Sequence, residues 1–237
     1  IYPSSLNGNY QLSNTMDFYN PYDDPLGQEE KLTKLFKDAI EQSYSEDAIE
    51  FSKYDLVVVF HAGIGQDFSL PFLDPTPEDI PSTYIDEDMI QEHLGESNII
   101  VGNHAIQKGI ILPETQNHLL YDISETMFSD AENPCEYQYG ITGTFSLMIG
   151  FAIGLPPLWN IQTGESGVGV FGLMDQGSNN GRGIIPAPPT AWSRIYAGWE
   201  NYVIGELGSE YHIPARSENS IIKVPIRENE YLSLIHI

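Results

Sequence analysis

The chain has 237 residues, and its 34 acidic and 10 basic side chains give a formal net charge of −24. A field of this sign repels phosphate backbones and anionic membrane surfaces, which excludes nucleic acids and lipid surfaces as partners and favours cations or a basic partner. The composition, with 41% hydrophobic and 11% aromatic residues, excludes a disordered chain, and no apolar run is long enough for a membrane span.

The first quarter of the chain predicts an arm, a helix and a strand. Residues 1–28 are rich in Asn, Tyr, Ser, Pro and Gly and lack periodicity, which predicts an extended arm lying on the body. We expect 29–237 to form a single domain. From Glu29 to Ser43 the apolar residues follow the spacing of an amphipathic helix. The β-branched run from Asp55 to Phe60 is typical of a buried central strand, and we assign the histidine that follows it, His61, a structural role.

The next segment, residues 72–95, carries many carboxylates among prolines. It predicts an exposed acidic loop leading into a short helix. Carboxylates at this density could chelate calcium, although the regular spacing and central glycine of a dedicated calcium loop are absent. Simple solvation of an acidic surface is the alternative. The candidate calcium ligands are Asp74, Asp79, Asp86 and Asp88.

Short strands and an apolar helix follow. Asn98–Asn103 and Gly109–Leu112 are expected to be strands that flank Lys108 and form a hairpin. Thr142–Ile153 predicts an apolar helix. The glycine-rich stretch 162–183 predicts tight loops.

The C-terminal part of the chain predicts a helix followed by strands. The helix is expected at Ala191–Trp199, with Trp192 and Tyr196 on one face. Alternation within 201–235 predicts an antiparallel sheet. Helices and strands together predict an α/β or α+β fold.

The stretch around Gly154 has the frame of a zinc-protease active site without its reactive groups. In the pattern H-E-x-x-H-x-x-G-x-x-[HD], three ligands hold zinc and the glutamate activates water. Aligned on Gly154, the ligand positions hold Leu147, Phe151 and Pro157, and the glutamate position holds Met148. Hydrocarbon side chains offer zinc no lone pair, and a thioether cannot act as a general base. The simpler alternative is a buried apolar helix.

Further segments match, in order, the motifs of one family. They are Phe51–Asp67, similar to "DFSxYD" and "HAGxGxE"; Gly154–Asn160, similar to "GLPDLYD"; Gly169–Asp175, similar to "GxWDLMG"; Pro188–Trp199, similar to "PxxxSAWxKxxLGW"; and the closing strands Ile221–Ile226 and Glu230–Leu234. Over roughly residues 30–235 the chain therefore resembles the secreted metallopeptidases related to immune inhibitor A. The "ENR" ending of that family is absent.

This resemblance implies a metzincin-like zincin fold: a twisted mixed sheet, an active-site-type helix, a Met-turn at Met174, and a C-terminal helix with strands. It also implies a secreted or cell-surface protein, of which this chain is expected to be a fragment. Asp175 is the one carboxylate expected near the old site.

The changed ligand positions indicate a catalytically inactive pseudopeptidase that holds no zinc. Its expected role is an extracellular binding or structural module for a protein or peptide partner, or for self-assembly. A cleft between the strand at Gly109 and the helix at 147–151 would hold an extended peptide by strand addition. The alternative is an active secreted peptidase or other hydrolase that uses a displaced metal or an unrecognised site.

Overall fold

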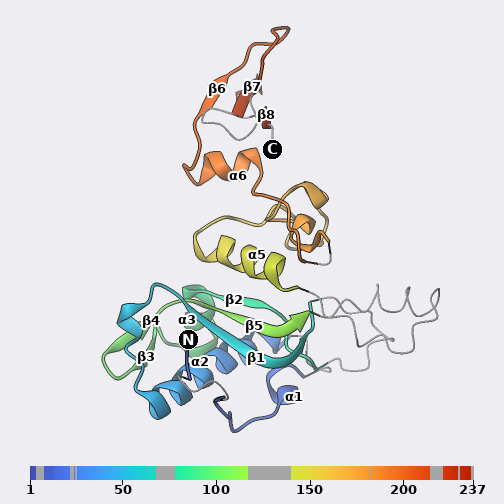
Figure 1. Cartoon of the computed structure of the whole chain (residues 1–237). Coiled ribbons are helices and arrows are strands. Elements are labelled where there is room, and N and C mark those ends of the chain that lie inside the picture. The colour runs from blue at the N-terminus through green and yellow to red at the C-terminus, as the bar shows by residue number, and fades with distance from the viewer. Residues whose placement is uncertain are drawn as a thin grey trace, which may run out of the picture.

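The computed structural model describes residues 1–3, 8–21, 24, 26–67, 78–116, 140–181, 183–213, 221–228 and 230–235. They form a mixed α+β architecture (Figure 1). The helices are α1 (Met16–Tyr19), α2 (Gln28–Asp47), α3 (Glu87–Leu94), α5 (Thr142–Ala152) and α6 (Ala191–Tyr196), with short 3-10 turns at Phe51–Lys53, Gly169–Phe171 and Gln176–Asn179. The strands are β1 (Val57–Gly65), β2 (Thr83–Ile85), β3 (Ile99–Val101), β4 (His104–Ile106), β5 (Gly109–Gln116), β6 (Tyr202–Ile204), β7 (Ile221–Arg227) and β8 (Glu230–Ile235).

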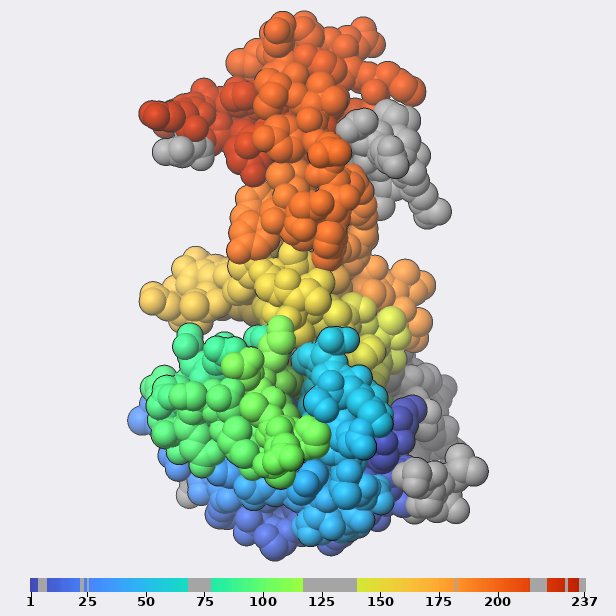
Figure 2. Space-filling model, turned by 90° about the vertical axis from the view of Figure 1, so that its left-hand side faces the viewer, coloured from blue at the N-terminus to red at the C-terminus, as the bar shows by residue number. Residues whose placement is uncertain are grey.

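The elements lie in three tiers along one axis. The N-terminal body, from the arm to β5, is blue to green in Figure 2, and the middle tier of α5 and its loops lies on it in yellow. The C-terminal tier, with α6 and the last three strands, stands furthest from the body. No helix in the described part of the chain is long and apolar enough to cross a membrane. The expected single domain from 29 to 237 remains a prediction.

Helix α2 confirms the amphipathic spacing seen in the sequence; it begins one residue before the predicted start and continues to Asp47, beyond the predicted end at Ser43. Its apolar face is buried in the core of the N-terminal body, where it meets Ile111 of β5. The buried residues of this face are Leu32, Leu35, Phe36 and Ile40. A side chain on Gly109 would collide with the ring of Phe36, so this glycine lets α2 lie directly on β5.

Strand β5 is the centre of the main sheet, and the prediction that β1 is the buried central strand is wrong. The strand order is β1-β5-β2, with β1 parallel and β2 antiparallel to β5. Ile110, Ile111 and Leu112 of β5 have no exposed surface, whereas Phe60 of β1 is 56% exposed. Both strands are apolar runs, but within the described part of the chain only β5 has a neighbour on each side.

The predicted hairpin around Lys108 is also wrong in its pairing. Strand β3 pairs with β4, not with β5. The chain reverses earlier than expected, at Gly102, whose φ of 56° lies in the left-handed region that favours glycine. Lys108 therefore lies in the connection between the small hairpin and the central strand.

The N-terminal arm lies on the body, as predicted, but it is not wholly extended because it contains α1. The Tyr10 hydroxyl donates to the Asp47 carboxylate at 2.5 Å. Tyr19 is only 2% exposed, and its hydroxyl donates to Asp38 at 2.8 Å. This buried aromatic residue anchors the arm on α2 and makes the arm part of the core.

The apolar helix predicted at 142–153 is confirmed as α5, which lies over the main sheet. The ring of Phe151 lies 6.2 Å from that of Tyr84 on β2. The Lys108 ammonium group donates to the carbonyl oxygen of Ala152 at 2.7 Å. Carbonyls in the last turn of a helix lack helical partners. Lys108 therefore ties the end of α5 to the N-terminal body.

The C-terminal tier combines α6 with a three-stranded sheet. Trp192 and Tyr196 stack with their ring centroids 4.9 Å apart, which confirms that they share a helix face. The sheet has the order β6-β7-β8. Only β7 and β8 are antiparallel, and β6 runs parallel to β7. The predicted wholly antiparallel sheet is therefore wrong for one of the two pairings.

Candidate functional site

Helix α5 presents hydrocarbon side chains where a zinc helix would present ligands. Leu147 and Phe151 are one turn apart and pack both on β5 and on the segment around Met174. Met148 is 8% exposed and belongs to the cluster of Ile110 on β5. This face of α5 is therefore apolar and packed, as its helical spacing predicts.

Met174 packs against α5 beside Leu147 and Phe151 and is fully buried. A side chain on Gly150 would collide with the Met174 sulfur, so the glycine permits close contact between the helix and this residue. The main chain fixes the position, since Leu158 N donates to the Met174 carbonyl at 2.8 Å. Pro157, the residue at the third ligand position, lies partly buried just before this contact and offers no ligand atom.

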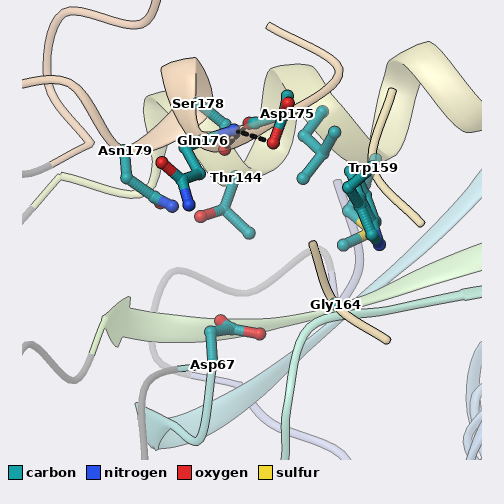
Figure 3. Close-up of a pocket in the computed structure, with 10 residues that line it drawn as sticks. Asp67, Thr144, Trp159, Gly164, Asp175, Gln176, Ser178 and Asn179 are labelled. Carbon is teal, nitrogen blue, oxygen red and sulfur yellow. Dashed lines mark hydrogen bonds between the residues drawn. The ribbon is translucent and has the colours of Figure 1, made fainter. Parts of the chain in front are cut away.

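A cavity of about 400 Å³ lies between α5, the end of β1 and the loop after Met174 (Figure 3). Leu147 and Met148 line it, so the altered side chains do not fill the space completely. Apolar packing and the Asp175 carboxylate are expected here from the sequence, but the other polar groups of the wall, Asp67 among them, are not. The lining residues are Asp67, Thr144, Leu147, Met148, Trp159, Gly164, Asp175, Gln176, Ser178 and Asn179.

Asp67 stands at the floor of this cavity, just after β1. Its Oδ1 accepts from Ser82 N at 2.8 Å and its Oδ2 from Ser82 Oγ at 2.7 Å. Gln116 Nε2 in turn donates to Ser82 Oγ at 3.3 Å. Burial raises the pKa of Asp67, and the hydrogen bonds from Ser82 and Gln116 offset only part of that effect. Asp67 is the acidic residue of the "HAGxGxE"-like segment, which is the signal in the sequence that could have placed it here.

Asp175 also borders the cavity, as expected from its position beside Met174, but its carboxylate is already occupied by the protein. Burial alone would raise its pKa; the hydrogen bonds outweigh that effect and hold the pKa below its ordinary value. The Oδ1 atom accepts from Gln176 N at 2.8 Å. The Oδ2 atom accepts four hydrogen bonds of 2.8 to 3.0 Å, from Ser166 Oγ and from the N–H groups of Gly167, Val168 and Gly169. Asp175 therefore organises the loop in front of it.

His61 links β1 to the segment before β2. Its Nδ1 lies 3.0 Å from the Ala62 carbonyl oxygen and its Nε2 lies 3.1 Å from that of Ile80. Both ring nitrogens thus face main-chain oxygens. The ring is absent from the wall of the cavity.

The predicted calcium ligands do not come together as a group in the described residues. Asp86 caps the start of α3 by accepting from Met89 N at 2.9 Å, and Asp88 is exposed in the first turn of that helix. Asp74 lies outside the described residues. Among the residues that the structure describes, no three His, Cys, Asp or Glu side chains are placed to hold a metal ion. Calcium binding, including a role for Asp79, stays a prediction.

Comparison of the chain with protein-family models, with curated protein sequences and with solved structures gives no match. The resemblance to immune inhibitor A-type metallopeptidases therefore rests on the motifs in the sequence alone.

Proposed function

We propose that this chain is a catalytically inactive, metallopeptidase-like domain that binds an extended peptide between α5 and the main sheet. The observation that carries the proposal is the cavity itself. The cavity beside α5 has a volume of about 400 Å³. Leu147 and Met148 line it, and they occupy the positions where a peptidase would need a zinc ligand and a general base. A concave site favours peptide binding over the flat contact that self-assembly would require.

The chemistry of the wall supports inactivity. Peptide hydrolysis needs an activated water, and the side chains of α5 that face this region have no group that could bind zinc or remove a proton. Asp175 has the charge for a metal ligand, but five hydrogen bonds already engage its two oxygens. On the resemblance to secreted metallopeptidases we further propose a metzincin-like fold, with Met174 in its Met-turn, and an extracellular or cell-surface location.

The peptide would pair with β2 rather than with the strand at Gly109. The earlier expectation for Gly109 is wrong, because β5 already has β1 on one side and β2 on the other. Among the described residues β2 pairs with β5 alone, so its outer edge can accept main-chain hydrogen bonds from an added strand. Ser82, which immediately precedes β2, is held by Asp67. A peptide along β2 would therefore pass close to Asp67 in the wall of the cavity.

Two measurements on the purified chain test this proposal. Elemental mass spectrometry after dialysis against a weak chelator counts zinc and calcium per chain, and a fluorogenic peptide library detects hydrolysis. We expect no stoichiometric zinc and no cleavage. Near-stoichiometric zinc or specific cleavage would support the alternative, an active hydrolase, and would overturn the proposal.

Peptide binding is then measured by fluorescence anisotropy with a labelled library. The exposed Gln176 lines the cavity, so Gln176→Trp should block the site without entering the core. Gln91→Trp, on the exposed side of α3, is the matched control. Binding that survives in Gln176→Trp at the strength of the control would place the peptide elsewhere.

A further inference from the structure

The cavity has one carboxylate that is available to a ligand. Of the ten lining residues in the described part of the chain, only Asp67 and Asp175 carry charge, and none is Lys, Arg or His. The Asp175 carboxylate is committed to its own loop, as described above. Asp67 is therefore the single charged group in this wall that a bound molecule could reach.

Asp67 has unused acceptor capacity directed at the cavity. A carboxylate offers about four lone-pair sites. Ser82 fills two of them, one on each oxygen, and a hydrogen bond from Gln116 uses a third, which leaves room for one further donor. Figure 3 shows the carboxylate across the cavity from Gln176 and Asn179. A partly desolvated carboxylate without a countercharge is costly, and a cationic group placed beside it offsets that cost. The raised pKa of Asp67 reflects the same unfavourable burial of its charged form.

The rest of the wall suits a long aliphatic stem. Leu147, Met148 and the ring of Trp159 supply apolar surface to the cavity. Lysine and arginine side chains combine an apolar stem with a multidentate cationic head.

We infer that this cavity recognises a basic side chain of the bound peptide, with the ammonium or guanidinium head at the Asp67 carboxylate and the stem along Leu147, Met148 and Trp159. The inference rests on the proposed peptide-binding function and specifies its ligand. An acidic side chain would meet Asp67 with like charge, and an apolar one would leave Asp67 without a partner. The net charge of −24 draws cationic ligands toward the molecule. Calcium prefers six to eight oxygen ligands, more than one free carboxylate supplies.

The test uses four blocked peptides that differ only at one central residue: lysine, arginine, norleucine or glutamate. Binding to the whole chain is measured by isothermal titration calorimetry, with tryptophan fluorescence as a second readout because Trp159 lines the site. The lysine and arginine peptides should bind at least about tenfold more tightly than the norleucine peptide. Asp67→Asn should remove this preference. Asp55→Asn, an identical charge change at an exposed position after α2, should keep it.

The outcomes separate this inference from the proposed function. Equal affinity for all four peptides would leave peptide binding intact and overturn the basic specificity. A preference that persists in Asp67→Asn would also overturn it, because the charge would then be read elsewhere. Asp67 would be a metal ligand if 1 mM calcium abolished the preference for the lysine peptide and if the wild type, but not Asp67→Asn, retained calcium. This outcome would refute the inference. Failure of every peptide to bind would refute the proposed function and this inference together. Circular dichroism confirms that each variant is folded before it is compared.

Discussion

Replacement of Asp175 by asparagine should destabilise the protein by an amount that can be worked out from its hydrogen bonds. The carboxylate accepts one hydrogen bond on Oδ1 and four on Oδ2. An amide has one carbonyl oxygen with two lone pairs, so asparagine can serve two of the five donors, and its NH₂ group would face another donor. Hydrogen bonds to charged groups contribute about 1.5–3 kcal/mol each. Water can reach part of the exposed loop at 166–169, so we expect a net loss of about 3 kcal/mol rather than the full sum.

The loss should appear as a fall in melting temperature at neutral pH. For a chain of this size about 1 kcal/mol corresponds to about 2–4 °C, which gives a fall of about 6–12 °C. Thermal denaturation followed by circular dichroism measures it. Asp55→Asn removes the same charge from an exposed side chain and should stay within about 0.5 kcal/mol of the wild type.

The stability that Asp175 contributes should depend on pH, and the sign follows from the direction of its pKa shift. Because the folded protein lowers the pKa of Asp175, the unfolded chain takes up this proton more readily than the folded one. The stabilisation is therefore fully present above the unfolded pKa of about 3.9 and is lost as the pH falls through the folded pKa. The gap between wild type and Asp175→Asn should be constant from about pH 5 to 8 and should shrink below about pH 4. A melting temperature equal to that of Asp55→Asn at pH 7, or a gap unchanged in acid, would refute the hydrogen-bond argument.

Three further variants test other parts of the structure. Lys108→Met removes the donor to the Ala152 carbonyl and should lower the unfolding free energy by about 1–2 kcal/mol. Amide hydrogen exchange at the end of α5 should become faster. Unchanged exchange there would contradict a stabilising role of this hydrogen bond. In Asp67→Asn the group with the raised pKa is gone, so the wild type should lose stability relative to this variant as the pH rises above the unfolded pKa of about 3.9. A difference in unfolding free energy that does not change with pH in chemical denaturation would contradict the sign. Gly143→Ala places a methyl group against the Ser178 carbonyl oxygen. Overpacking typically lowers the unfolding free energy by about 1–3 kcal/mol, and we expect a loss of at least the upper value, measured as a lower denaturation midpoint. Stability close to that of the wild type would mean that α5 and the loop after Met174 are not in close contact.

The local elements of this fold could be predicted from sequence because their signals are local. The spacing of Leu32, Leu35 and Phe36 identifies a helix without knowledge of what it packs on, and the apolar run at 142–153 does the same for α5. The place of a strand within a sheet depends on partners far away in the chain. β1 and β5 are both apolar, and only the pairing of Ile110 and Ile111 with neighbours on both sides distinguishes the central strand.

The candidate site could be predicted only in part, for the same reason. The motif pattern located Leu147 and Met148 beside the site, since both lie on one short helix. It could not show that Asp67, some 80 residues earlier, would stand in the same wall, because that depends on how α5 lies over the sheet. Nor could it show that Asp175 would be occupied, since its partners at 166–169 fold back onto it through glycine-rich main chain.

The loop at 166–169 is built like an anion receptor. Three consecutive N–H groups that converge on one point form a concave host for anions, of the kind that elsewhere holds phosphates and developing oxyanions. Here the bound anion is the Asp175 carboxylate of the same molecule, which lies 6, 7 and 8 residues after the three donors Gly169, Val168 and Gly167. An external phosphate or the oxyanion of a tetrahedral intermediate would find these donors already taken. The protein's own carboxylate thus closes this loop to external anions.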